Sequence, residues 1–244
     1  MKYTACFVLA VIIAYPFSRS AAHAGEAFAA VRNDMVAEIE AMVSETSGYT
    51  GIDRLRPPVV QALQRVSRHE FVPAELEAYA YRNQPLAIGH DQTISQPYIV
   101  ALMTELADVD ADSVVLEVGT GSGYQAAILA QLVDQVFTVE RINDLLVQAR
   151  KRFQELNLRN IRLKHSDGSW GWKANAPYDG ILVTAAPAEI PADLCQQLAD
   201  GGRMVIPVGG SGKQKLQCVT RTDDAFEVET LELVSFVPLL GGTS

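Results

Sequence analysis

The length and composition of the chain exclude several kinds of protein. It has 244 residues, 48% of them hydrophobic and 20% charged, so it can bury a sizeable core in a single domain. A formal net charge of −9 opposes binding to nucleic acid, because phosphate backbones are bound by clustered Lys and Arg. The three cysteines fit neither a disulfide framework nor a zinc cluster, and we expect no metal site.

The first 24 residues have the pattern of a secretory signal peptide. Lys2 gives a basic start, residues 5–15 are apolar, and Ala22-His23-Ala24 offers a small-residue cleavage site. The apolar run is shorter than the ~20 residues that span a bilayer. We therefore predict a leader over residues 1–24 and a mature single domain over 25–244 with no stable membrane span. A buried amino-terminal helix would give the same pattern.

Residues 25–110 are expected to form a helical amino-terminal part that carries the substrate loop. Apolar side chains recur at three- and four-residue steps over residues 27–43, which is the pattern of an amphipathic helix. A second helix is expected to begin at Pro57 or Pro58, since proline is tolerated in a first helical turn.

A third helix is expected over residues 96–107, with Pro97 in its first turn and Ser95 at the N-cap position. This would place a hydroxyl beside the free N–H groups of a helix start, a combination that suits an anion.

Beyond residue 110, short apolar strands alternate with amphipathic helices. This order is typical of a parallel sheet covered by helices on both faces, so the fold class expected for residues 111–244 is α/β. The expected strands are 113–118, 135–140, 161–165, 180–184 and 203–208, and the expected helices are 122–133, 142–157 and 191–199. Residues 215–221 and 226–233 alternate in polarity around a turn, which predicts an antiparallel hairpin at the sheet edge.

A glycine-rich turn follows the first of these strands, in Val114-Val115-Leu116-Glu117-Val118-Gly119-Thr120-Gly121-Ser122-Gly123. Glycine lets the backbone approach a ligand closely, and the helix start that follows offers free N–H groups. A dinucleotide-binding loop reads G-x-G-x-x-G, whereas here the third glycine comes one residue early. The loop also lacks the lysine that an ATP- or GTP-binding loop requires.

Acidic residues end the next two strands. Glu140 closes the second strand, and Asp167, followed by Gly168, closes the third. The carboxyl ends of parallel strands line one crevice, where Glu140 can accept hydrogen bonds from ribose hydroxyls and Asp167 from an amino group such as that of adenine. Either acid alone could instead cap a helix or a turn.

The pattern E-x-G-x-G-x-G with an acid at the end of the next strand resembles the class I methyltransferases, which bind S-adenosyl-L-methionine. Other segments narrow the resemblance to the protein-L-isoaspartate O-methyltransferases, over residues 30–240. These segments are His69-Glu70-Phe71-Val72-Pro73, Gln92-Thr93-Ile94-Ser95-Gln96-Pro97-Tyr98, Val183-Thr184-Ala185-Ala186-Pro187 and residues 201–209. The family commonly has Pro and Gly where this chain has Ala87 and Asp91.

This resemblance implies a Rossmann-like class I methyltransferase sheet and an activity. The enzyme would transfer a methyl group from S-adenosyl-L-methionine to the free carboxyl of isoaspartyl residues in damaged proteins, and the ester would close to a succinimide and begin repair. The resemblance implies Ser95 as the active-site residue. It also implies Thr93, Ile94, Gln96, Thr184 and Ala185 around the substrate, and Glu117, Gly119, Thr120, Gly121, Ser122, Gly123, Glu140, Asp167 and Gly168 around the donor.

The chemistry of the acceptor defines the role expected of Ser95. An α-carboxyl has a pKa of about 3.5, so it is ionised at neutral pH and needs no general base. Catalysis can therefore depend on alignment, with Ser95 as a positioning donor and not as a nucleophile.

From the residues alone, an NAD(P)-dependent oxidoreductase and a catalytically silent binding protein of the same fold remain alternatives. The oligomeric state expected is a monomer. The leader favours the periplasm, whereas the donor is made in the cytoplasm, so the sequence leaves the compartment open. It also leaves open whether Cys195 pairs with Cys218.

Overall fold

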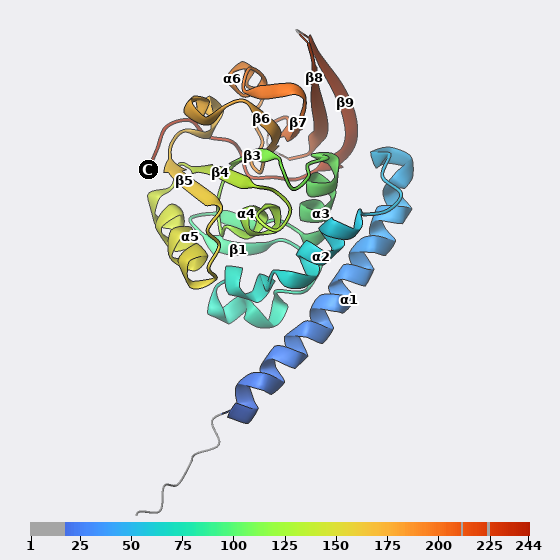
Figure 1. Ribbon diagram of the computed structural model, residues 1–244, viewed down its shortest axis with the longest axis vertical. Coiled ribbons are helices and arrows are strands. Elements are labelled where there is room, and N and C mark those ends of the chain that lie inside the picture. The colour runs from blue at the N-terminus through green and yellow to red at the C-terminus, as the bar shows by residue number, and fades with distance from the viewer. Residues whose placement is uncertain (1–17, 211, 224) are drawn as a thin grey trace, which may run out of the picture.

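The computed structural model describes residues 18–210, 212–223 and 225–244, and within them a seven-stranded sheet forms the centre of the molecule (Figure 1). The strand order is β5-β4-β3-β6-β7-β8-β9. The strands are β3 (Val114–Val118), β4 (Gln135–Glu140), β5 (Ile161–His165), β6 (Tyr178–Val183), β7 (Leu198–Val208), β8 (Gln214–Thr222) and β9 (Ala225–Val234). Strands β3 to β7 are parallel, and β8 and β9 are antiparallel, which confirms the predicted sheet and edge hairpin.

Successive residues of the central strands face two different cores, as a parallel sheet buried on both sides requires. On β3, Val115 belongs to the core that also includes buried residues of α1 (Ser18–Thr50), α2 (Pro57–Arg65), α3 (Pro97–Leu106), α4 (Tyr124–Leu129) and α5 (Asn143–Glu155). Leu116 faces the opposite core, which includes residues of α6 (Ala192–Cys195). Helices therefore cover both faces, as predicted, but the helix expected over residues 191–199 is only the short α6, because β7 begins at Leu198.

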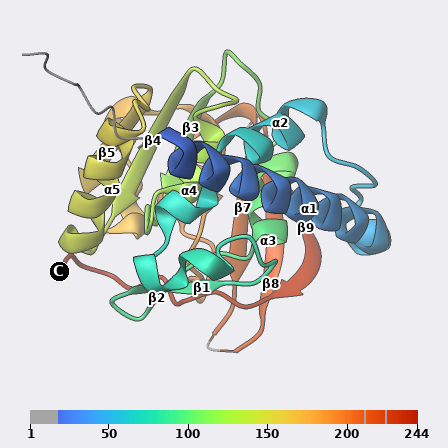
Figure 2. The same ribbon diagram turned by 90° about the horizontal axis from the view of Figure 1, so that it is seen from below.

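Helix α1 is longer than the sequence pattern predicts. It extends from Ser18 to Thr50, beyond the expected 27–43 at both ends, and buries Met35, Ile39 and Val43 against the body. Figure 2 shows it crossing the face formed by α2 and α3. Residues 1–17 of the predicted leader lie outside the described residues, and residues 18–24 belong to α1. Among the described helices, none combines the length and apolar content needed to cross a bilayer.

A hairpin that the sequence did not predict brings the Thr93 segment to the sheet. Strands β1 (Leu86–Gly89) and β2 (Gln92–Ile94) pair antiparallel. The connecting residues His90 and Asp91 have φ of 53° and 55°, so the turn is left-handed at both positions, as in a type I′ turn. Asp91 thus adopts the backbone conformation for which the family commonly has glycine, because a short polar side chain tolerates this region.

Four short 3₁₀ helices complete the described elements: η1 (Arg68–Phe71), η2 (Ala74–Tyr79), η3 (Gly168–Trp170) and η4 (Lys173–Asn175). The two cysteines left open by the sequence do not pair: Cys195 of α6 and Cys218 of β8 are both buried and free.

Candidate functional site

The glycine loop between β3 and α4 has a backbone conformation that requires glycine. Gly119, Gly121 and Gly123 have φ of 98°, 51° and 89°, a region that residues with a Cβ rarely adopt. A Cβ on Gly119 would also lie 2.5 Å from the Thr184 hydroxyl oxygen, and one on Gly123 would lie 2.6 Å from the Phe153 ring. The loop is therefore packed tightly against β6 on one side and α5 on the other.

Glu140, at the carboxyl end of β4, fixes the position of this loop. Its Oε2 accepts a hydrogen bond from the Gly121 N–H at 2.9 Å, and its Oε1 accepts one from the Ile142 N–H at 2.9 Å. Each carboxylate oxygen can accept a second hydrogen bond. The side chain therefore holds the loop and keeps acceptor capacity toward the crevice, where a ribose would require it.

Glu117 lies beneath the loop and is fully buried. Its Oε2 accepts a hydrogen bond from the Thr138 hydroxyl at 2.5 Å, whereas its Oε1 has no partner among the described residues. Burial raises the pKa of Glu117 to about 8, the Thr138 hydrogen bond opposes this rise, and the charge of Glu140 adds to it. A buried carboxyl with an unpaired oxygen favours a ligand with N–H groups or positive charge and disfavours a pyrophosphate.

Asp167, between β5 and η3, holds both the following turn and the end of the chain. Its Oδ1 accepts hydrogen bonds from the Ser169 N–H at 2.9 Å and hydroxyl at 2.6 Å, and its Oδ2 accepts one from the Gly242 N–H at 2.6 Å. Burial opposes ionisation of this carboxyl, but the hydrogen bonds outweigh it and lower its pKa. Asp167 is thus an anion at neutral pH.

The carboxyl-terminal segment covers the ends of the parallel strands. The Ala186 N–H donates to the Val237 carbonyl at 2.8 Å, and the Leu239 N–H donates to the Ala186 carbonyl at 2.8 Å. Further along, the Ser244 N–H donates to the Arg141 carbonyl at 2.8 Å. Residues 237–240 thereby form one wall of a cavity of about 60 Å³, whose opposite wall includes Gly119, Gly121, Glu140, Gly168 and Ala185.

A second, smaller cavity of about 40 Å³ lies on the other side of the loop. Its lining includes Ile94 and Ser95 as well as Glu117, Gly119, Thr120, Gly121 and Ser122. Gly123 and Asp167 line neither cavity: Gly123 packs on α5, and Asp167 is engaged by the carboxyl-terminal segment. The structure therefore brings most of the predicted donor residues together around the two cavities. Gly123 and Asp167 instead support the backbone that forms the cavity walls.

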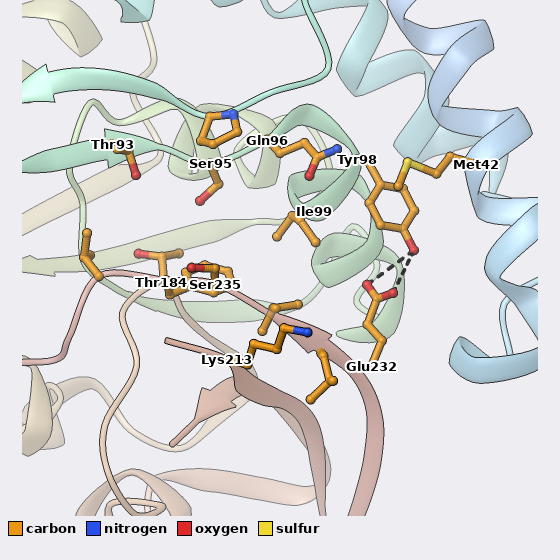
Figure 3. Close-up of a pocket in the computed structure, with 15 residues that line it drawn as sticks. Met42, Thr93, Ser95, Gln96, Tyr98, Ile99, Thr184, Lys213, Glu232 and Ser235 are labelled. Carbon is orange, nitrogen blue, oxygen red and sulfur yellow. Dashed lines mark hydrogen bonds between the residues drawn. The ribbon is translucent and has the colours of Figure 1, made fainter. Parts of the chain in front are cut away.

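A pocket of about 410 Å³ opens beside these cavities (Figure 3). Of the predicted substrate residues, Thr93, Ser95, Gln96 and Thr184 line it, whereas Ile94 and Ala185 line only the smaller cavities. Its other walls are Met42, Pro85, Tyr98, Ile99, Lys213 and residues 232–237. Tyr98 belongs to the segment that carries the family resemblance, and the resemblance also implies the carboxyl-terminal segment from Val237 near the substrate. No local pattern marks the rest, because they come from α1, α3, the end of β9 and the segments before β1, before β8 and after β9.

The structure corrects the prediction that Ser95 caps a helix. Helix α3 begins at Pro97, and its N-cap residue is Gln96, which makes no side-chain cap. Ser95 is held through its backbone, since its carbonyl accepts a hydrogen bond from Nη2 of the fully buried Arg68 at 2.7 Å. Its hydroxyl is directed into the pocket (Figure 3).

Thr184, at the end of β6, joins the pocket to the glycine loop. Its hydroxyl shares its one proton between the backbone carbonyls of Val118 and Gly119, at 3.0 and 2.8 Å. Both Thr93 and Thr184 line all three cavities. A ligand on the loop and a second ligand in the pocket would therefore meet beside these two threonines.

A parallel sheet with a glycine loop after its central strand, carboxylates at the next two strand ends and an unpaired buried acid beneath the loop defines a class I S-adenosylmethionine-dependent methyltransferase. The sequence model of the family described as Protein-L-isoaspartate(D-aspartate) O-methyltransferase matches residues 40–244. The chain belongs to this family.

Individual relatives agree with this assignment. The chain is 46% identical, over 99% of its length and 98% of the relative, to Protein-L-isoaspartate O-methyltransferase 2 of Syntrophobacter fumaroxidans. It is 60% identical to Protein-L-isoaspartate O-methyltransferase 1 of Nitrosococcus oceani, over 76% of this chain and 88% of the relative. A Plasmodium falciparum structure of a putative family member, in complex with S-adenosyl-L-homocysteine, is 25% identical with a TM-score of 0.67, over 82% of this chain and 98% of that one.

Proposed function

We propose that the chain methylates the free carboxyl of isoaspartyl residues in damaged proteins, with S-adenosyl-L-methionine as the methyl donor. The observation that carries the proposal is the junction at Thr93 and Thr184, where the large pocket meets both cavities of the glycine loop. A carboxylate placed beside Ser95 would face a donor held on the loop.

The residues of the donor side fit S-adenosyl-L-methionine. Gly119–Ser122 and Glu117 suit the amino-acid portion, whose ammonium group would pair with the free Oε1 of Glu117 and, through its positive charge, favour ionisation of this otherwise protonated carboxyl. Glu140 suits the ribose, and Gly168 suits the adenine. Asp167 lines neither cavity, but it directly precedes Gly168, and the remaining acceptor site on its Oδ2 would take a hydrogen bond from the adenine amino group. When bound, the donor supplies a methyl group on a positively charged sulfur. The fit favours this donor over a nicotinamide dinucleotide, whose pyrophosphate would lie over Glu117.

The protein contributes alignment and exclusion of water. The acceptor carboxylate is already ionised, so Ser95 orients it by donating a hydrogen bond, and Arg68 holds the Ser95 backbone in place. Positioning of two reactants can contribute on the order of 7–11 kcal/mol in favourable cases. Methyl transfer neutralises opposite charges, and a wet site would favour the separated ions. Residues 237–240 shield the donor side from solvent.

The experiment that tests this proposal measures transfer of a labelled methyl group to an isoaspartyl peptide. Calorimetric titration with S-adenosyl-L-methionine and with NAD in parallel separates the methyltransferase from the oxidoreductase. A catalytically silent binding protein would bind the donor and transfer nothing. Binding of NAD in place of the donor would overturn the proposal.

We further propose that residues 1–24 are a cleaved leader, that the mature chain is a monomer and that it does not bind nucleic acid. The amino-terminal pattern and the net charge of −9 support these statements. Sequencing the amino terminus of the protein from fractionated cells tests the leader and distinguishes periplasm from cytoplasm. A mature chain that begins at Gly25 is the expected result. Analytical ultracentrifugation tests the monomer.

A further inference from the structure

The pocket in Figure 3 is larger than an acceptor carboxylate requires. Its volume is about 410 Å³, and Thr93, Ser95 and Thr184 form only the end nearest the glycine loop. The far end is formed by Tyr98 of α3 and Glu232 of β9, together with Met42 of α1. A peptide whose isoaspartyl carboxylate lies at Ser95 must therefore place a neighbouring residue toward this far end.

Glu232 lies beside the Tyr98 hydroxyl at the far end. The single proton of the Tyr98 hydroxyl faces both of its carboxylate oxygens, at 3.3 and 3.4 Å, and the same hydroxyl lies 2.8 Å from the Thr46 hydroxyl of α1. Burial raises the pKa of Tyr98 to about 12, so the phenol keeps its proton at neutral pH. Side chains of α1, α3 and β9 thus meet at this carboxylate on the pocket wall.

This carboxylate has no counter-ion in the described part of the chain. No Lys, Arg or His nitrogen there lies within 4.0 Å of Glu232. The side chain is only partly exposed, and a carboxylate offers about four acceptor sites, of which Tyr98 uses a minority. Lys213, the other charged side chain of the lining, is exposed. Glu232 is therefore the partly buried charged side chain of the far end.

We propose that Glu232 determines which residue is accepted next to the isoaspartate. The far end of the pocket is a subsite for that neighbour, and it favours Lys or Arg, whose N–H groups complete the hydrogen bonding of Glu232, over Asp or Glu, which it repels. This inference rests on the proposed function, because it assigns the pocket to the acceptor peptide.

The experiment uses two series of synthetic isoaspartyl peptides, with Lys, Gln or Glu directly before or directly after the isoaspartate. A partly exposed ion pair with Glu232 should make the KM of the Lys peptide about fivefold lower than that of the Gln peptide. The Glu peptide should have the highest KM of the three. We expect this order in one series, since only one neighbour can point to the far end. Raising the salt concentration should reduce it, because salt screens partly exposed charges.

Substitutions at position 232 test whether the Glu232 side chain causes the preference for Lys over Glu beside the isoaspartate. In Glu232→Gln the order should disappear, and in Glu232→Lys it should invert. Glu229→Gln, on the same strand but exposed and outside the pocket, should keep it. Donor affinity, measured by calorimetry, reports whether each variant is folded.

The outcomes separate this inference from the proposed function. A wild-type enzyme that methylates all the peptides without preference overturns the subsite and leaves the methyltransferase standing. Persistence of the preference in Glu232→Gln also overturns it. Failure to methylate even the Gln peptides overturns the proposed function and the subsite with it.

Discussion

Replacing Asp167 with alanine should weaken donor binding strongly. The wild-type carboxylate accepts hydrogen bonds from Ser169 and Gly242 and is ionised, so it can also accept one from the adenine amino group. A hydrogen bond to a charged group contributes about 1.5–3 kcal/mol. Its loss corresponds to an increase of about 10- to 100-fold in the Kd of the donor. Release of the Gly242 contact should also loosen the wall formed by residues 237–240, and the donor should then dissociate faster.

Calorimetric titration with S-adenosyl-L-homocysteine measures this effect, and Asp179→Ala provides the matched control. Asp179 also accepts a backbone hydrogen bond, from the Val114 N–H at 2.7 Å, but it lies near the start of β6, at the amino ends of the parallel strands, whereas the site lies at their carboxyl ends. The control should bind the donor with wild-type affinity, although both variants lose some thermal stability. Wild-type affinity in Asp167→Ala, or equal weakening in the two variants, would refute the reasoning.

Three further changes test other parts of the account. Ser95→Ala should lower kcat/KM for an isoaspartyl peptide about 10- to 100-fold, through loss of one hydrogen bond to the acceptor anion, while the donor Kd stays unchanged; equal turnover by the two folded proteins would remove Ser95 from the site. Gly123→Ala should lower the free energy of unfolding in urea by about 1–3 kcal/mol, because its Cβ would lie 2.6 Å from a ring atom at a φ of 89°, whereas Gly48→Ala, in open space on α1, should not. Glu117→Gln should remove a pH-dependent loss of stability. Burial raises the pKa of Glu117 from 4.5 to about 8, so between these values the carboxyl is ionised in the unfolded chain but protonated in the folded one, and the stability of the wild type falls as pH rises. The difference in Tm between the variant and the wild type should therefore grow from pH 5 to 8, and a constant difference would contradict a buried, protonated Glu117.

The central strands could be predicted from sequence because their pattern is local. Residues 135–140 and 161–165 are strands with those bounds, since apolar residues alternate with polar ones or cluster within a few positions between polar, turn-forming stretches. The β1–β2 hairpin was missed because its left-handed turn is made by His90 and Asp91, without the glycine that usually indicates a type I′ turn. Helix α1 extends past its amphipathic stretch at both ends, where the apolar period gives no signal.

The candidate site also has parts that local sequence predicts and parts that it does not. The glycine loop is encoded in consecutive residues, and Glu140 and Asp167 each lie at or just after the end of a predicted strand, so their type and position predict them. The hydrogen bonds from Gly242 to Asp167 and from Tyr98 to Glu232 join residues 75 and 134 positions apart, and only the folded chain brings them together. The N-cap prediction for Ser95 was wrong because α3 begins at Pro97, one residue later than expected, and the cap position passes to Gln96.

The most direct test of the central claim is transfer of a radiolabelled methyl group from S-adenosyl-L-methionine to two peptides that differ only in isoaspartate against aspartate. The site described above predicts that the purified protein labels the isoaspartyl peptide as a base-labile methyl ester and leaves the aspartyl peptide unlabelled. Labelling of both peptides alike, or of neither by a protein that binds the donor, would contradict it.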